Sequence, residues 1–119
     1  MATIGISASL SLTGPVNASL SGSKSITQTG ADYTVQSQSI GTSAEQLDFA
    51  GEIGTLGYLM VKNEDSTNFV ELALDSGVST QKFAKLRAGE FIVFPPSTAT
   101  LYAKADTAAC VVSIVALEL

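Results

Sequence analysis

The chain contains no histidine, and this absence removes the most common general base and metal ligand of proteins. Nucleophile pairs of the Ser–His and Cys–His types are therefore impossible. Tryptophan is absent as well, and Cys110 is the only cysteine, so no intrachain disulfide can form. Cys110 lies in the apolar stretch "AACVVSIVAL", where a buried and unreactive thiol is expected. The sequence thus predicts no catalytic residue, no cofactor and no metal, and we expect no enzymatic activity.

Charged side chains are also scarce. They make up 14% of the chain, with 6 basic and 11 acidic residues and a net charge of −5. Soluble domains usually carry about 25%. The acidic balance disfavours nucleic-acid binding, which needs a basic face, and binding to anionic membranes. Serine and threonine replace the missing charges, and removing water from a neutral hydroxyl group costs less free energy than removing it from an ion. Such a surface favours lasting contacts with other proteins.

Targeting signals are missing from the printed sequence. The start "MATIGISASL" has no basic residue and no long apolar block, which a signal peptide would show. The longest apolar run, residues 108–117, is shorter than the roughly 20 residues that span a bilayer. We therefore expect a protein made in the cytoplasm that does not enter a membrane.

Three groups of residues could carry chemistry, and each has a plainer interpretation. Ser23 and Lys24 are adjacent on an expected strand, so their side chains point to opposite faces. Asp48 and Glu52 could form a carboxylate pair, but exposed acids beside turns are the more common case. The segment "NEDSTN" (63–68) has oxygen ligands at alternate positions, yet it lacks the glycine and the distal glutamate of a calcium loop. A polar turn is expected there.

The first third of the chain alternates with a period of two. Apolar residues occupy the even positions Ile4, Ile6, Leu10 and Leu12, while serines fill most odd ones. This pattern is typical of a half-buried strand. After a break at residues 13–15 the alternation resumes to residue 23. Residues 1–29 therefore read as a Ser-rich strand or arm, packed on or swapped with a domain over 30–119. The four apolar residues are the predicted interface, because an extended strand can add to a neighbour's sheet edge.

The rest of the chain contains short apolar segments separated by turns, and no segment has helical spacing. A short edge strand is expected around Tyr33 and Val35, and a central strand over 55–63, which is apolar on both faces. Further strands are predicted in the segments 44–54, 68–75, 81–87, 90–95, 99–105 and 108–118. In 68–75, Val70, Leu72 and Leu74 should share a face. The spacing predicts an all-β fold of eight to ten strands, an antiparallel, jelly-roll-like β-sandwich.

Carbohydrate binding usually rests on exposed aromatic side chains. The chain has three tyrosines and five phenylalanines, most of them inside expected strands. Tyr33, Tyr58 and Tyr102 are therefore expected in the core or in an interface rather than on a sugar-binding surface.

Residues 57–105 contain the segments "GYLMVKNEDSTNFVELALDSG" and "FAKLRAGEFIVFPPSTATLYAKAD". These segments resemble small structural proteins of tailed bacteriophages. The matching positions are Gly57, Tyr58, Asn63, Asp65, Asn68, Phe69, Val70, Lys85, Leu86, Gly89, Glu90 and Tyr102 to Ala105. These residues are mainly turn and strand formers: the short polar side chains of Asn63, Asp65 and Asn68 are expected to close a hairpin turn. Gly89 is expected to take a positive φ in "RAGE". About half of the chain is covered, and the Ser-rich start has no counterpart.

The resemblance implies a β-sandwich located in the virion and without an active site. It is consistent with a capsid decoration (cement) protein that binds where major capsid subunits meet. It implies the major capsid protein or other virion proteins as partners, and a homo-oligomer, with a trimer as one possibility. A tail, baseplate or head–tail junction protein fits the same residues. A carbohydrate-binding host-adhesion module is the alternative from another functional class.

Overall fold

The computed structural model describes residues 2–49, 51 and 53–119 of the chain. These residues form ten strands and no α-helix, and every strand pairing is antiparallel, as the alternating pattern predicts. They include no helix with the length and apolar character needed to cross a membrane. The chain divides into two compact units, Met1–Ala31 and Asp32–Leu119. The division lies two residues beyond the boundary expected from the sequence. Each unit is described by itself below.

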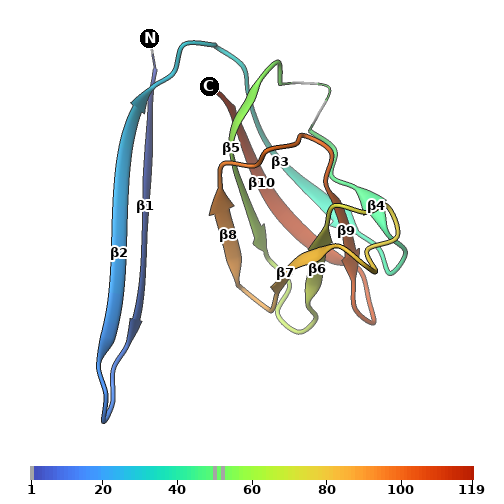
Figure 1. Ribbon diagram of the computed structural model, residues 1–119. Coiled ribbons are helices and arrows are strands. Elements are labelled where there is room, and N and C mark those ends of the chain that lie inside the picture. Colours follow the sequence, from blue (N-terminus) through green and yellow to red (C-terminus); the bar gives the residue numbers. More distant parts are fainter. Residues whose placement is uncertain (1, 50, 52) are drawn as a thin grey trace. The chain divides into compact units, whose positions relative to one another are not determined.

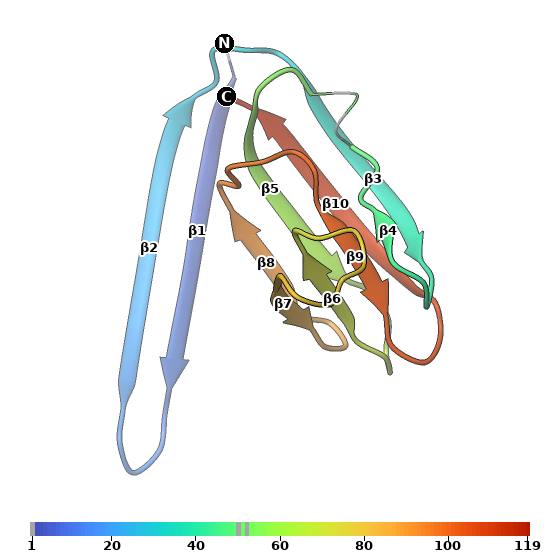
Figure 2. The same ribbon diagram turned by 45° about the vertical axis from the view of Figure 1, so that its right-hand side comes forward.

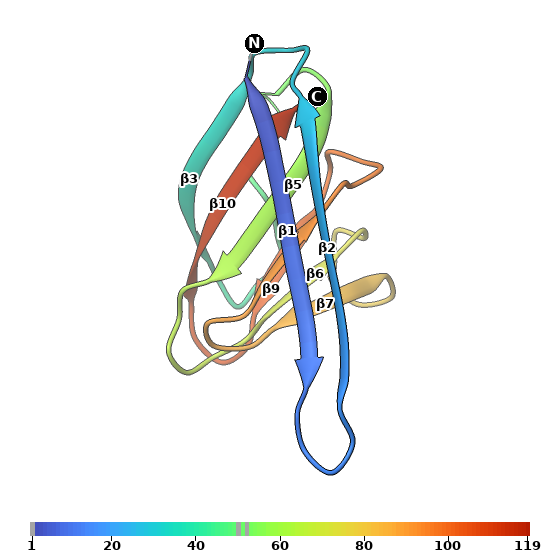
Figure 3. The ribbon, with the colours of Figure 1, turned by 90° about the vertical axis from the view of Figure 1, so that its left-hand side faces the viewer.

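The first unit is a long two-stranded ribbon, made of β1 (Thr3–Leu12) and β2 (Ala18–Thr27) (Figure 3). Ten residue pairs join the two strands in an unbroken register, from Thr3 opposite Thr27 to Leu12 opposite Ala18. In the turn, the side-chain oxygen of Asn17 accepts a hydrogen bond from the Gly14 amide. We call β1 and β2 together the N-terminal ribbon.

The second unit contains two four-stranded sheets (Figure 1). Sheet B has the strand order β3-β10-β5-β8 and sheet C the order β4-β9-β6-β7. The strands of sheet B are β3 (Tyr33–Ile40), β5 (Leu56–Asn63), β8 (Phe91–Phe94) and β10 (Cys110–Glu118). Those of sheet C are β4 (Glu45–Gln46), β6 (Val70–Ala73), β7 (Lys82–Leu86) and β9 (Tyr102–Ala105). Asp32–Leu119 is called the two-sheet unit.

Both sheets contribute to one hydrophobic core, and Figure 2 shows the two layers. Alternate residues of each strand face inward, as the period of two requires. The fully buried members include Ile40, Leu47, Phe49, Val61, Val70, Leu72, Ala103, Val112 and Ile114. Cys110 is also fully buried, and this burial raises the pKa of its thiol. The expectation of a buried thiol is confirmed.

Several expectations from the sequence need correction. Ala73, the last residue of β6, is buried, and Leu74 just beyond the strand is exposed, so Leu74 does not share the face of Val70 and Leu72. The register between β6 and β7 shifts here, because Leu72 pairs with Ala84 and Ala73 with Lys82, which leaves Phe83 of β7 as the extra residue. The edge position of β3 is confirmed, but this strand has eight residues rather than a few. Of the residues in the segment 44–54 that the structure describes, only Glu45–Gln46 form a strand.

The tyrosines are also less buried than expected. Tyr33 is 70% exposed, so it is not a core residue, whereas Tyr58 and Tyr102 are half-buried. Tyr33 is the first residue of edge strand β3, and its side chain points to the outer face of sheet B because its neighbour Thr34 is buried.

Candidate interaction surfaces

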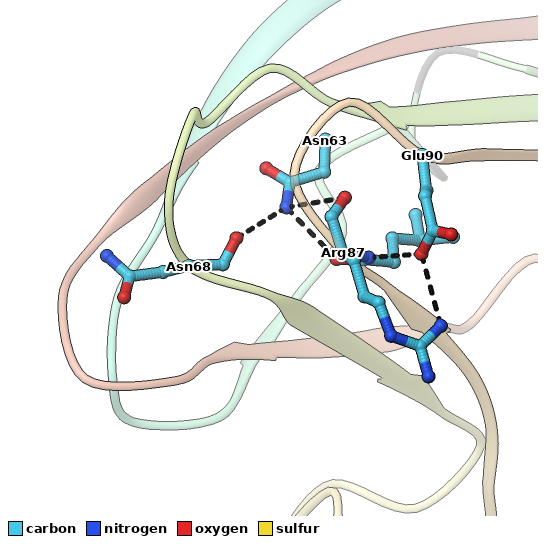
Figure 4. Close-up of polar contacts among 5 residues, drawn as sticks. Asn63, Asn68, Arg87 and Glu90 are labelled. Atoms are coloured by element: carbon cyan, nitrogen blue, oxygen red, sulfur yellow. Dashed lines mark hydrogen bonds and ion pairs between the residues drawn. The ribbon is translucent and has the colours of Figure 1, made fainter.

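Asn68 and Glu90, two of the residues that carry the resemblance, lie beside the buried residue Asn63, which carries it too (Figure 4). Its side-chain amide nitrogen donates to the backbone oxygens of Asn68, Leu86 and Arg87 at 2.9, 3.0 and 3.3 Å. Its side-chain oxygen accepts from the Asp65 amide at 3.0 Å. Asn63 thus fastens the segment after β5 to the segment after β7, and each of these segments leads from one sheet to the other. The turn after Asn63 is a crossover between sheets and not a hairpin turn, which corrects the expectation from the sequence.

The two turns joined by Asn63 have defined local geometry. Asp65 accepts hydrogen bonds from the amides of Thr67 and Asn68, and the bond from Asn68 contributes most to lowering the pKa of its carboxyl. Gly89 has φ of 77°, as expected for "RAGE", and its amide donates to the Asn63 carbonyl. Glu90 accepts from the Arg87 amide at 2.7 Å. Residues that carry the resemblance thus form the hydrogen bonds of these two turns.

Other residues that carry the resemblance lie in strands or next to them. The Lys85 ammonium lies 4.1 Å from the centre of the Phe69 ring, a cation–π contact. Val70 pairs with Leu86 on one side and Ala105 on the other. The residues that carry the resemblance therefore lie mainly in turns and in paired strands.

Among the described residues, those with possible chemistry are not assembled into a site. Ser23 lies opposite Ser7 and Lys24 opposite Ile6, so the serine and the lysine point to different faces of the ribbon. The expected polar turn at 63–68 is confirmed, because Asp65 bonds its own backbone. No group of three or more His, Cys, Asp or Glu side chains that could hold a metal occurs among the described residues. Asp48 is described, but its proposed partner Glu52 lies outside the described residues.

The N-terminal ribbon has two faces of opposite character. On one face the cross-strand pairs are mostly apolar, for example Ile4 with Ile26 and Leu10 with Leu20. The other face consists of hydroxyl pairs and one Gly–Ser pair: Thr3–Thr27, Gly5–Ser25, Ser7–Ser23, Ser9–Ser21 and Ser11–Ser19. Each strand has a partner on one side only, so both outer edges expose backbone groups able to pair with another strand.

The four predicted interface residues differ in exposure. Ile4 is buried and Ile6 is half-buried, whereas Leu10 is 80% exposed and Leu12 is also exposed. Sequence reasoning missed Leu20, the cross-strand partner of Leu10, which is 79% exposed. Its signal was present in the resumed alternation after the turn. Leu10, Leu12 and Leu20 form what we call the ribbon's leucine strip.

A second apolar surface covers the outer face of sheet B. The registers place Tyr33 beside Leu117 and Tyr58 in one row, and Val35 beside Val115, Met60 and Val93 in the next. Tyr33 and Val35 are each 70% exposed, and the other five are half-buried. We call these seven residues the outer band. An antiparallel sheet with one solvated face normally carries polar residues there, so this band is unusual.

The outer band is bordered by a polar row. Here Ser37, Ser113 and Lys62 lie side by side, and the exposed Phe91 completes the row. The Lys62 ammonium lies 3.3 Å from a Glu64 carboxylate oxygen, so its charge is paired at the surface. Sequence reasoning missed the band as a unit, because its residues come from four strands that are distant in the sequence.

A smaller apolar groove lies at β7 and β8, which are edge strands of sheets C and B. Phe83 and Phe94 pack at 5.8 Å between ring centres, and Leu74, Pro95, Pro96 and Leu101 also line the groove. The segment "EFIVFPP" therefore has a structural role: Phe94 packs against the core and Pro95 ends the strand without leaving an unpaired donor.

Comparison with known proteins gives no relatives: no family model, no curated protein and no solved structure matches the chain. The resemblance to phage structural proteins consequently stays a prediction that rests on the quoted residues.

Proposed function

We propose that the two-sheet unit is a jelly-roll β-sandwich. Its strand order supports this topology: among the eight strands β3 to β10, only β6 and β7 follow one another within a sheet. The other six connections each lead from one sheet to the other. An eight-stranded arrangement of two sheets with this alternation is that of a jelly roll, an architecture found in viral capsid and lectin domains.

We further propose that the chain is a bacteriophage virion structural protein, in the first place a capsid decoration protein. The observation that carries this proposal is the outer band, an apolar surface spread over four strands on a rigid sheet. Contiguous exposed apolar patches mark protein–protein contacts. The row that borders the band consists of two serines, one lysine with a paired charge and the exposed Phe91, and the neutral groups among them lose little hydration free energy on contact. Shape and apolar area, with no reactive group, are what a cement protein needs.

The mechanism is the repetition of a modest contact. A typical protein interface buries about 1,600 Å² in total. A small domain that occupies every joint of a shell, and that contacts its own neighbours, gains strength through multivalency even when one contact is weak. The N-terminal ribbon adds a second means of attachment, because its free strand edges can extend a sheet of a neighbouring subunit.

Deletion of residues 1–14 tests this function. The deletion removes β1 and should abolish binding to capsids that lack the protein, while the two-sheet unit stays folded because its core begins at Ile40. Binding is measured by co-sedimentation with particles, and folding by circular dichroism. The double substitution Ser9→Ala with Ser21→Ala, on the hydroxyl face, is the matched control and should bind normally. A truncated protein that decorates particles as well as the full chain would refute the attachment role of the ribbon.

Copy number separates a decoration protein from a tail, baseplate or head–tail junction protein. A protein at every capsid joint is present in hundreds of copies, while closed rings of a tail hold far fewer, on the order of ten. Gel densitometry of purified virions, calibrated on the major capsid protein, measures this number. A count near ten would assign the protein to the tail.

Two exposed aromatic residues favour a second candidate, a carbohydrate-binding adhesion module. Tyr33 and Phe91 lie on the outer face of sheet B and are accessible, and aromatic faces can stack on sugar rings. A glycan array tests this candidate directly. Saturable binding that is lost in Tyr33→Ala would support adhesion over the cement function.

A further inference from the structure

We propose that the leucine strip of the N-terminal ribbon docks on the outer band of a second copy of this chain. Both surfaces expose large apolar side chains: Leu10, Leu12 and Leu20 on the strip, and Tyr33 and Val35 on the band. They also differ in kind: the strip lies on a two-stranded ribbon, and the band lies on a four-stranded sheet. This inference refines the proposed function by naming the contact between neighbouring copies.

The ribbon needs such a partner for its own stability. A two-stranded hairpin alone in water is at best marginally stable, and a covered apolar face is what usually stabilises it. Leu10 and Leu20 lie opposite each other and are 80% and 79% exposed, so the single chain leaves their side chains in water. If the strip lies on a sheet, the Ser and Thr pairs of the opposite face point outward. The ribbon then forms a third layer with a polar outer surface.

Charge favours a ribbon-to-sheet contact over a contact between two sheets. Residues 1–31 contain one charged side chain, Lys24, and no acidic residue. The two-sheet unit holds the other 5 basic and all 11 acidic side chains, which gives it a net charge of −6. Two such units repel one another, whereas the ribbon brings no negative charge to the sheet that it covers.

The dimensions of the surfaces favour a reciprocal exchange. A ten-residue strand is about 33 Å long, so a face two strands wide is about 33 Å by 10 Å. A ribbon that laid its whole apolar face on a sheet would bury at most about 650 Å² over both partners, because Ile4 on this face is already buried, and this is well below the roughly 1,200 Å² of a stable interface. Two such contacts, in which each chain both gives and receives a ribbon, bury at most about 1,300 Å². A closed dimer or ring of chains can thus reach the stable range, and a single contact cannot.

Two variants separate the two sides of this contact. Leu10→Ser with Leu20→Ser removes the strip, and Val35→Lys places a charge in the outer band on an edge strand; all three side chains are exposed, so the fold should tolerate the changes. Ser9→Ala with Ser21→Ala is the control on the ribbon's other face. The full chain has a mass of 12.2 kDa, so each species is resolved by light scattering after size exclusion.

We expect the full chain and the control to have at least twice the single-chain mass, and each interface variant alone to be a monomer. Mixing the two variants should restore association, at least tenfold weaker than in the full chain, because one intact strip meets one intact band. A monomeric full chain at tens of micromolar overturns the proposal, and so does a ribbon docked within its own chain. If the strip variant still associates, the contact is between two sheets. If the Val35→Lys variant still associates, the contact is between two ribbons. Either result also overturns the proposal.

These measurements use no phage particles. A full chain that stays monomeric but still binds capsids would refute this contact and leave the decoration function standing. Self-association without capsid binding would refute the decoration function alone.

Discussion

At the scale of single residues, the polar side chains of this protein hold its turns. Asn63 is the clearest case, because a buried amide satisfies backbone groups from two connections at once. Asp75 has the same function in the loop between β6 and β7, where it accepts hydrogen bonds from Ser79, Thr80 and Gln81. The loop also holds Val78 at φ of 49°, an unfavourable value for a β-branched residue, so the hydrogen bonds offset local strain.

Replacement of Asn63 by alanine should destabilise the two-sheet unit by about 3 kcal/mol, because buried carbonyls lose their donor. Urea unfolding measures this loss. Asn68→Ala is the control: its side chain bonds only the exposed Thr107 hydroxyl in the contacts described, and we expect a loss below about 1 kcal/mol. Equal stability of Asn63→Ala and the unchanged chain would contradict the role given to this residue.

The Asp75 carboxyl predicts how stability depends on pH. Hydrogen bonds, first of all from the Ser79 amide, lower its pKa from 3.8 to about 2. Because the folded state has the lower pKa, this contribution is complete above pH 4 and is lost as the pH falls toward 2. Melting temperatures measured across this range should fall, and Asp75→Asn should reduce the slope. A remaining slope is expected from Asp65, whose pKa is also lowered. If the melting temperatures of the two proteins fell in parallel as the pH was lowered, Asp75 would be excluded as a source of the pH dependence.

At the scale of elements, backbone geometry decides how strands are joined. Strand β6 ends at Ala73, so Leu74 lies outside the strand and is exposed, and the turn at residues 87–90 redirects the chain from sheet C to sheet B. This second turn depends on the left-handed conformation of Gly89, which a residue with a Cβ adopts only with strain.

Gly89→Ala should therefore destabilise the two-sheet unit by about 1 kcal/mol, through backbone strain alone. An added Cβ would meet no atom within 4 Å, so steric overlap does not contribute. Gly22→Ala in the ribbon is the matched control, because it has equally open space and no positive φ. Thermal unfolding followed by circular dichroism measures both variants. The interpretation fails if Gly89→Ala unfolds at the temperature of the unchanged chain.

At the scale of the whole molecule, charge and apolar area are unevenly distributed. The two-sheet unit carries all the acidic residues, and the ribbon is almost uncharged. Among the described residues, five exposed large apolar side chains lie on the leucine strip and the outer band: Leu10, Leu12, Leu20, Tyr33 and Val35. The proposals of capsid decoration and of ribbon exchange use these surfaces in different ways, and particle binding and self-association in solution test them independently.

The sequence by itself determined the secondary structure and much of the turn chemistry. Alternation with period two depends only on neighbouring residues, so it located nearly every strand, and the positive φ of Gly89 followed from its place in "RAGE". Only the tertiary structure decided which strands lie side by side. Strand pairing joins residues far apart in the chain, such as Tyr33 with Leu117, and local patterns do not encode it. For the same reason the sequence misplaced Leu74 and did not reveal the outer band, whose rows exist only once four separate strands are in register.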